Sequence, residues 1–486
     1  MLFNTIEFAY FFAVVFLIYW GVARHIRFRN LLLLAASYFF YGFWDWRFLI
    51  LIVLSSLVDF MVGLSMVRTD SQLKRRWLLA TSLCTNLGIL IYFKYAGFFV
   101  QSFVDVFRLF GSELNSVSLE IILPVGISFY TFQTLSYTID IYRGKIEPTT
   151  DALSFFAFVA FYPQLVAGPI ERASRLLPQF KQTHRFQYQM VKSGLLLMAF
   201  GLFKKMVIAD RAGMYVDQVY GQPALYDGTA YAIATVLFAF QIYCDFSGYS
   251  DIAIGTARTM GFRLIQNFDR PYIATSLTEF WHRWHISLST WFRDYLYIPL
   301  GGSQKGPYRM HFNIFLVFLI SGLWHGAAWT FVIWGGLHGI LLILEKVLSL
   351  GHPEQSDGLG KWVPHWAQLL FTFGIVNVAW VFFRAESLSQ SILMIKGLFT
   401  NQDVDSLVAL RAFEIGMSVT AFCVLVLFIA MLCGFEWLHS KRNMSAQLRN
   451  QPIYIRWLAY YVIVMVLIIF GVYDNEQAQS FIYFQF

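Results

Sequence analysis

Apolar stretches recur along the whole chain, separated by short polar segments. Most are about 16 to 22 residues long, close to the roughly 20 residues that an α-helix needs to cross a bilayer. The pattern predicts membrane-spanning helices at 5–23, 31–46, 48–67, 77–94, 121–139, 152–168, 190–209, 229–244, 312–333, 334–349, 365–383, 416–437 and 457–472. No repeat or linker divides the chain, so we expect residues 1–486 to form a single integral membrane domain.

Two segments are interrupted in a way that an ordinary spanning helix does not tolerate. The segment "LPVGISFYTFQTLSYTIDIYRG" (123–144) begins with Pro and Gly and ends with an acid and a base. The segment "FYPQLVAGPIERASRLLP" (161–178) contains a Gly-Pro pair and two further prolines. Irregular backbone at membrane depth is tolerated only where it is buried in protein or lines a wet cavity. We therefore expect re-entrant or tilted segments around a polar interior.

Basic residues cluster in three loops, whereas both ends of the chain carry acids. The bases are Arg24, Arg27, Arg29, Lys74, Arg75, Arg76, Lys441, Arg442, Arg449 and Arg456, and the acids are Glu7, Asp474 and Glu476. Because cytoplasmic loops are enriched in Lys and Arg, the three loops are predicted to be cytoplasmic and both termini periplasmic or extracellular. The first apolar stretch has no basic segment before it, so we expect a retained span and not a cleaved signal.

The composition agrees with a membrane protein. The chain is 58% hydrophobic and 13% charged, whereas soluble domains are about one-quarter charged. The net charge of +7 is accounted for by basic cytoplasmic loops, so we expect no nucleic-acid partner. The four cysteines, which lack CxxC spacing, are expected to be small core residues and not a disulfide framework or metal site; they are Cys84, Cys244, Cys423 and Cys433.

The segment "EFWHRWHISLSTWF" (279–292) is unusually polar for this chain. If it forms one helix, spacings of three and four give it an apolar face of Leu277, Trp281, Trp284, Leu288 and Trp291. A tryptophan-rich amphipathic helix is typical of the membrane interface, which would explain the polarity without any chemistry. His282 and His285 would share a face and could hold zinc, but no third ligand or HExxH pattern accompanies them, so we expect no metal site.

The longest uncharged run, Phe312–Leu344, contains no acid, lysine or arginine. As one helix it would be about 50 Å long, far more than the roughly 30 Å bilayer core, so it must break, at Gly322–Gly326 or at Gly335–Gly336. His325 would then lie near mid-membrane, where an ionisable residue is a functional hypothesis by default. The glycines beside it would leave room for a substrate.

A buried neutral histidine suits general-base chemistry, and a satisfied core histidine is the alternative for His325. On an unbroken helix His338 would face the opposite way, and we expect it to be packed and hydrogen-bonded. The chain has no GxSxG, Walker A or GxGxxG motif. These absences disfavour a serine hydrolase, an ATP-driven pump and a dinucleotide enzyme.

Long motifs in the chain resemble those of the membrane-bound O-acyltransferase (MBOAT) family, and more closely its bacterial branch that O-acetylates exopolysaccharides such as alginate. The motifs are the segments at 123–144 and 161–172, "QIYCDFSGYSDIAIG" (241–255), "NFDRPYIATSLTEFWHRWHISLSTWFRDYLYIPLGG" (267–302), "SGLWHGAAWTFVIWGGLHG" (321–339) and the tail "FIYFQF". They extend over most of the chain, and the long central ones are highly specific.

The resemblance implies roles for single residues. His325 matches the catalytic histidine of the family, and His285 matches a second position that is Asn in other branches. Many relatives carry Arg in place of His282, so we do not expect His282 to be required. The motif positions expected to contact substrates are Gly322, Trp324, Gly326, Ser287, Arg293 and Asp294.

The resemblance also implies a fold and a reaction. The fold would be an all-α polytopic membrane protein, a ring of tilted helices with re-entrant segments around a thin catalytic tunnel. Acetyl-CoA would enter from the cytoplasm as the acyl donor, with no permanently bound cofactor. In a bacterial inner membrane, among membrane lipids, acetyl would pass to periplasmic or extracellular partner proteins that deliver it to a polysaccharide.

Two alternatives remain at this point. An enzyme of the same class could act on peptidoglycan or cellulose, or transfer D-alanine to teichoic acid. A secondary transporter with broken helices is the rival from another class. It predicts inverted repeats and intramembrane charges, and the sequence shows neither clearly.

Overall fold

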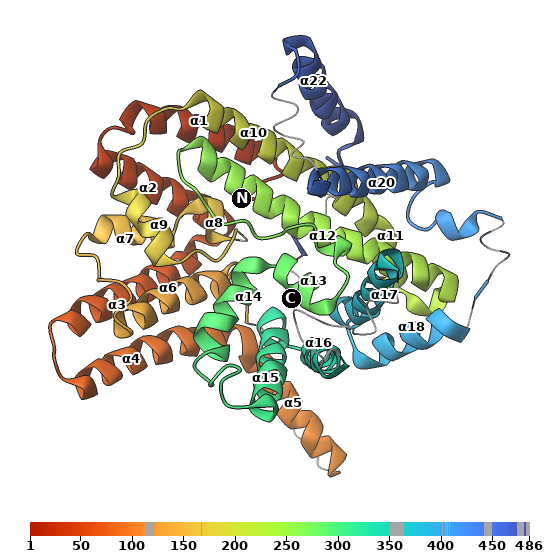
Figure 1. Cartoon of the computed structure of the whole chain (residues 1–486), viewed down its shortest axis with the longest axis horizontal. Helices are drawn as coiled ribbons and strands as arrows, with labels where there is room; N and C mark the ends of the chain where they lie inside the picture. Colours follow the sequence, from red (N-terminus) through yellow and green to blue (C-terminus); the bar gives the residue numbers. More distant parts are fainter. Residues whose placement is uncertain are drawn as a thin grey trace. The chain divides into compact units, whose positions relative to one another are not determined.

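The computed structural model describes residues 1–111, 121–166, 168–348, 364–400, 409–441, 450–473 and 481–482, together with 402, 403, 405 and 407. Every regular element in this part of the chain is helical (Figure 1). Seven helical segments among these residues are long and apolar enough to cross a membrane: 26–67, 72–109, 228–259, 329–348, 365–384, 419–439 and 453–470. The expected all-α polytopic membrane protein is confirmed.

The chain divides into two compact units. Unit 1 comprises Met1–Met198 and Ile252–Ile265, and unit 2 comprises Ala199–Asp251 and Gln266–Phe486. Two of the three divisions fall inside α10 (Tyr188–Leu202) and inside α12 (Gly228–Thr259), and the third lies between Ile265 and Gln266. The single domain and the ring around a tunnel that we expect from the sequence stay predictions.

Unit 1 consists of α-helices joined mostly by short connections. They are α1 (Ile6–Val22), α2 (Ile26–Asp45), α3 (Leu49–Val67), α4 (Gln72–Leu90), α5 (Ala96–Leu109), α6 (Ile127–Tyr142), α7 (Ala152–Val159), α8 (Tyr162–Leu165) and α9 (Ala173–Phe180), besides its part of α10 and α12. Side-chain caps begin several of them, because Thr5, Ser71 and Asp151 accept N–H groups that lack a partner within the helix.

A polar seam joins α3, α4 and α6 inside unit 1. Asp59 on α3 is fully buried and accepts hydrogen bonds from Ser82, from Asn86 (2.9 Å) and from Thr138 (3.0 Å). Buried polar groups persist when they are hydrogen-bonded, so these contacts hold the three helices in one register.

The two interrupted segments meet in unit 1. The first one enters α6 through Gly126, whose φ is +73°, and a Cβ added there would lie 2.6 Å from the carbonyl oxygen of Leu165. The second one begins at Phe161, which together with the preceding Ala160 separates α7 from α8, and both residues are fully buried. The break between α7 and α8 is therefore buried in protein, one of the settings in which irregular backbone is tolerated, whereas Gly126 is only half-buried. The expected re-entrant or tilted segments around a polar interior stay a prediction.

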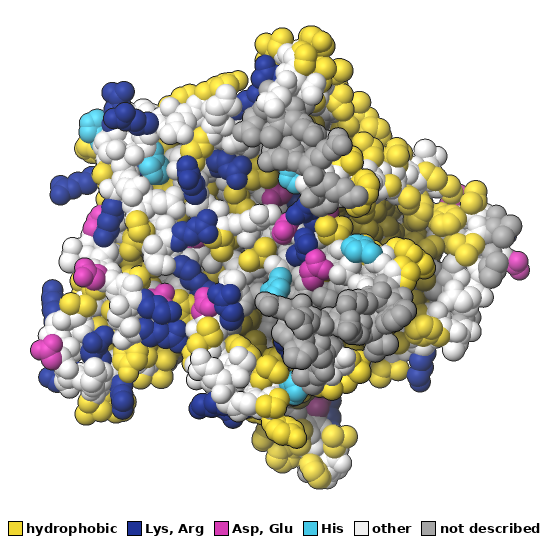
Figure 2. Space-filling model, in the orientation of Figure 1, with side chains coloured by type: hydrophobic (Ala, Val, Ile, Leu, Met, Phe, Trp, Pro, Cys, Tyr) yellow, Lys and Arg dark blue, Asp and Glu magenta, His cyan; other side chains and the backbone are white. Residues whose placement is uncertain are grey.

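Unit 2 contains the rest of the helices. Its α-helices, besides its part of α10 and α12, are α11 (Asp210–Gly221), α13 (Leu277–Arg283), α14 (Ile286–Phe292), α15 (Pro307–His325), α16 (Trp329–Leu348), α17 (His365–Arg384), α18 (Leu388–Thr400), α20 (Val419–Lys441) and α22 (Ile453–Phe470). Apolar side chains such as Trp457 and Leu458 are exposed on α22, and Figure 2 shows a mostly apolar surface there. Such a surface suits contact with lipid tails.

The burial of the cysteines differs from the prediction. Cys244 is buried on α12, but Cys84, Cys423 and Cys433 are exposed, so the prediction of core residues is wrong for three of the four. Their helices are among those apolar enough to span a membrane, and an apolar residue on such a helix can face lipid instead of a protein core. All four are free thiols. The terminal acids Asp474 and Glu476 lie outside the described residues.

Three glycines allow α15 and α16 to pack closely, and Figure 1 shows the two helices side by side. A Cβ added at Gly322 would lie 2.2 Å from the carbonyl oxygen of Phe331, and one at Gly335 would lie 2.3 Å from that of Phe318. A Cβ at Gly326 would overlap the Phe331 ring, at 2.1 Å. The space beside these glycines is therefore filled by the neighbouring helix. A substrate contact with Gly322 or Gly326 stays a prediction.

Gly322→Ala should destabilise the protein, because the new methyl group has to push α16 away. Gly374→Ala on α17 is a matched control, since nothing lies within 4 Å of a Cβ added there. Alanine in a helix is otherwise about 0.5–1 kcal/mol more stable than glycine, so the control should melt at or above the wild-type temperature. The measurement is thermal unfolding of the purified protein in detergent. Equal melting temperatures for the two variants would contradict this account of the helix contact.

Candidate functional site

His325 is the last residue of α15. Gly326 follows in an extended conformation, and α16 begins at Trp329. The long apolar run thus breaks at the first of the two predicted glycine sites. The side chain of His325 is 2% exposed, so the break places an imidazole inside the protein at the end of a helix.

His285 stands at a second break. The single helix predicted over 279–292 is wrong: α13 ends at Arg283, and His285 precedes α14 with a left-handed φ of +44°. His282 is exposed and His285 is 1% exposed, so the two do not share a face. The apolar face of the segment is nevertheless buried, including Trp281 and Trp284, and it packs against protein where we expected the membrane interface.

The two breaks bring His285 and His325 together. Their ring centroids are 6.3 Å apart, and Trp324 contacts both rings, at 5.9 Å from His285 and 4.9 Å from His325. Of the residues predicted from the motifs, the structure therefore gathers both histidines and Trp324 in one place.

Large aromatic side chains surround His325, and we call Trp324, Trp334, Trp380 and Phe383 the aromatic shell. Trp334 and Phe383 have their centroids 5.1 Å and 5.5 Å from that of His325, and Trp380 stacks on Trp334 at 5.6 Å. All four are at most 4% exposed. An apolar environment of this kind disfavours the charged form of an imidazole.

His338 also contacts Trp334. Its ring is 5.1 Å from Trp334 and 5.1 Å from Trp281. The predicted packing is confirmed, but among the described residues neither ring nitrogen has a hydrogen-bond partner. Because the chain breaks after His325, the opposite orientation expected on an unbroken helix does not apply.

Polar groups hold His285. Asn267 Oδ1 lies 3.2 Å from His285 Nδ1 and accepts a hydrogen bond from the Ser287 hydroxyl at 2.8 Å. Ser287, predicted as a substrate contact, is fully buried and serves here to position the loop. The aromatic rings of Phe246 and Phe268 cover the imidazole, with centroids at 4.7 Å and 6.4 Å.

Arg293 and Asp294, also predicted from the motifs, pair with each other. Their Nε and Oδ1 atoms are 2.8 Å apart, and the Arg293 side chain is 60% exposed. They lie in a short π-helical turn after α14. Their contact with a substrate stays a prediction.

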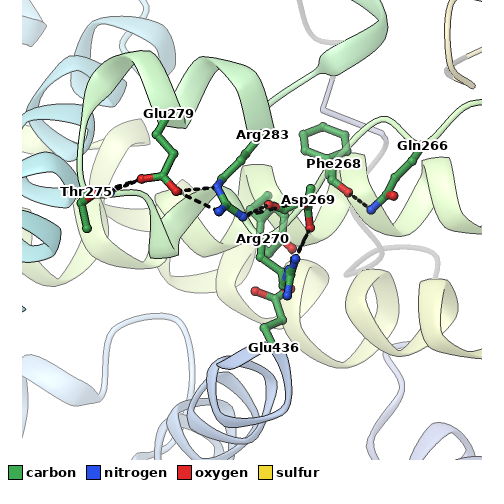
Figure 3. A network of polar contacts seen from close by, with 9 residues as sticks. Gln266, Phe268, Asp269, Arg270, Thr275, Glu279, Arg283 and Glu436 are labelled. Atoms are coloured by element: carbon green, nitrogen blue, oxygen red, sulfur yellow. Dashed lines mark hydrogen bonds and ion pairs between the residues drawn. The ribbon is translucent and has the colours of Figure 1, made fainter. Parts of the chain in front are cut away.

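A polar network connects α13 with the segment of the chain that precedes it (Figure 3). Glu279 accepts hydrogen bonds from Thr275 and Arg283, and Arg283 also donates to the carbonyl oxygen of Asp269 at 3.2 Å. Burial alone would raise the pKa of Glu279, but these hydrogen bonds and the charge of Arg283 hold it below its ordinary value. Glu279 and Arg283 also form an ion pair at the helical i,i+4 spacing, with Arg283 Nη2 and Glu279 Oε1 2.8 Å apart.

The described residues contain no group of three or more His, Cys, Asp or Glu side chains placed to hold a metal ion. The chemistry open to the site is that of two buried imidazoles, one of them inside the aromatic shell. A neutral imidazole can accept a proton from a hydroxyl group within reach, and the closed surroundings limit competition by water.

Sequence reasoning missed several residues of the site. Trp380 and Phe383 looked like ordinary members of an apolar span, and nothing in that pattern separates them from lipid-facing residues. Asn267 was visible as the first residue of a motif. Its contact with His285 depends on a turn of the chain that periodicity does not detect.

Comparison with known proteins supports a relationship over the whole chain. The model of the membrane-bound O-acyltransferase family matches residues 145–382. The chain is 38% identical to the probable alginate O-acetylase AlgI of Pseudomonas putida, with 100% of both chains covered. It is 37% identical to the peptidoglycan O-acetyltransferase of Helicobacter pylori, covering 82% of this chain and 80% of that protein. It is 27% identical to the teichoic acid D-alanyltransferase of Streptococcus thermophilus, covering 53% and 68%.

Proposed function

The chain belongs to the membrane-bound O-acyltransferase family, and we propose that it takes acetyl groups from a cytoplasmic thioester, acetyl-CoA, for the O-acetylation of an exopolysaccharide such as alginate. The observation that carries this proposal is the buried pair of His285 and His325, whose rings lie 6.3 Å apart. Family membership makes the protein an O-acyltransferase. It also argues against the secondary transporter.

In the proposed reaction, His325 acts as the general base. The neutral imidazole takes the proton of the acceptor hydroxyl while that oxygen bonds to the thioester carbonyl carbon. The C–S bond then breaks, and the proton passes from His325 to the departing thiolate. General-base catalysis contributes roughly 10²–10⁴-fold, and alignment in a confined site adds to it.

The choice of acceptor rests on similarity. The relative named for alginate matches along its whole length, whereas the relative named for teichoic acid matches only about half of this chain. The peptidoglycan enzyme is nearly as similar, so peptidoglycan is the second candidate acceptor. In either case the acceptor lies outside the bacterial inner membrane, and partner proteins there would receive the acetyl group.

His325→Gln should abolish acetylation, because an amide keeps hydrogen bonding but cannot take a proton. We expect a fall of about 10²–10⁴-fold, the range of general-base catalysis. The measurement is the acetyl content of the secreted polymer from cells with equal amounts of each variant in the membrane. His338→Gln is the matched control and should keep most of the activity, since His338 contacts the aromatic shell and not His325. Wild-type acetylation by His325→Gln would remove the general-base role.

Substitutions of His285 and His282 should have different effects on acetylation in the same assay. His285→Ala should lose most of the activity, because it removes a ring that lies against His325 and Trp324. His282→Arg should keep most of it, since His282 is exposed and the family resemblance implies that Arg is tolerated there. The reverse result, with an active His285→Ala and an inactive His282→Arg, would show that the wrong histidine was assigned.

Orientation can be tested with single cysteines in a background that lacks the exposed native ones. Reagents that cannot cross the membrane should label Arg27→Cys and Arg75→Cys only from the cytoplasmic side, and Glu7→Cys only from outside. The reason is the excess of bases in the first two loops. Labelling with the opposite sidedness would invert the proposed donor and acceptor sides.

A further inference from the structure

The segment 267–270, which precedes α13, runs beside the junction of α13 and α14 that contains His285. Ile286 N donates to the carbonyl oxygen of Asn267 at 2.9 Å, and Asp269 N donates to that of Arg283 at 2.9 Å. The Arg283 side chain also binds the Asp269 carbonyl within the network of Figure 3. These bonds fix Asn267 next to His285, although the two residues are far apart in sequence.

The orientation of the Asn267 amide follows from a backbone donor. Ser287 N lies 3.2 Å from the side-chain atom Oδ1 of Asn267. A backbone N–H can only donate, so the amide atom that faces it has to be the oxygen. The other amide atom, Nδ2, then lies 3.3 Å from the Ser250 hydroxyl and donates to it.

This orientation determines where His285 carries its proton. Its Nδ1 faces Asn267 Oδ1 at 3.2 Å and Ser287 Oγ at 3.5 Å. The amide oxygen has no proton, and the Ser287 hydroxyl directs its own proton to that same oxygen at 2.8 Å. Both atoms can therefore only accept from Nδ1. A neutral imidazole in this position keeps its hydrogen on Nδ1 and its lone pair on Nε2.

We propose that Asn267 is a positioning residue that fixes His285 in the Nδ1–H tautomer, so that Nε2 acts as a hydrogen-bond acceptor toward a substrate O–H or N–H group. This inference rests on the proposed acyl transfer and refines it. In this tautomer His285 orients a substrate by accepting a hydrogen bond. It cannot donate one from Nε2 to the oxyanion that forms at the thioester carbon.

The same contacts stabilise the conformation of His285. A left-handed φ in a residue other than glycine costs about 1–3 kcal/mol and persists where the surroundings fix it. Asn267 supplies those surroundings, because its carbonyl oxygen and its Oδ1 accept the N–H groups of the two residues that follow His285.

The kinetic test is Asn267→Asp, which keeps the accepting oxygen and adds a negative charge beside Nδ1. Such a charge raises the pKa of a histidine by about 1–3 units. The imidazolium carries hydrogen on both nitrogens, so Nε2 no longer accepts. Burial lowers the pKa of His285 to about 3, so the added charge brings it to about 4–6. Transfer to a soluble acceptor by the full-length protein in detergent should therefore be near the wild-type rate at pH 7 and fall about tenfold relative to wild type as the pH is lowered to about 4–5. His325 is the titratable group whose ring faces His285; Phe246, Phe268 and Trp324 carry no charge.

Two further variants separate positioning from folding. Asn267→Leu should lower the rate by about 10- to 100-fold at every pH, by analogy with the range seen when an orienting partner of a metal-bound histidine is removed. Ser250→Ala leaves Oδ1 in place and should keep the wild-type pH profile. An Asn267→Asp profile identical to that of wild type would overturn the proposal.

A spectroscopic measurement is independent of activity. In ¹⁵N-histidine-labelled protein, the His285 signals can be recognised among the ten histidines by their loss in His285→Gln. We expect a protonated Nδ1 and an unprotonated Nε2. The opposite tautomer would overturn the proposal even if the enzyme is active, whereas a wild-type protein with the expected tautomer and no acyl transfer would count against the proposed function alone.

Discussion

The close contact between α15 and α16 is the constraint on which the rest of the site depends. Gly322 and Gly335 let the two helices approach until one backbone touches the other. Without a hydrophobic force between helices in lipid, such packing of small residues is a main source of helix association. Because His325 ends α15 and Trp334 lies on α16, the same contact sets the distance between the candidate base and the ring that faces it.

The second constraint is that each break in the backbone needs new hydrogen-bond partners. Such breaks survive at membrane depth only when protein groups satisfy the freed N–H and C=O groups. At the junction of α13 and α14 that role falls to Asn267, which is itself held by the network around Arg283. Two of the described residues with positive φ lie here. His285 is in the junction itself, and Arg270 is in the segment that is hydrogen-bonded to it. Strained backbone of this kind is typical of functional sites.

The sequence predicted the membrane class and indicated Gly322–Gly326 as one of two places where the long apolar run breaks, because composition and helix length bear directly on these features. It also singled out His325 and, through the family motifs, His285, and the structure places their rings 6.3 Å apart. The prediction from sequence failed where the apolar side-chain pattern continues although the helix is broken. The apolar stripe that includes Trp281 and Trp284 continues across the junction, so periodicity predicts one helix where the structure has two. The role of Asn267 was hidden for a related reason. It depends on contacts between segments that only the folded chain brings together.

The surroundings of the two histidines fit the charge changes of acyl transfer. The reaction begins with a neutral hydroxyl and a neutral thioester, and it ends with a neutral ester and a neutral thiol, so a site lined by tryptophan and phenylalanine need not hold a lasting charge. In the proposed reaction, charge separates only while His325 carries the proton, and an apolar shell would favour its rapid return to the thiolate. Burial lowers the pKa of His285 and keeps it neutral, which suits the same requirement, because a second positive charge beside His325 would oppose proton uptake by the proposed base.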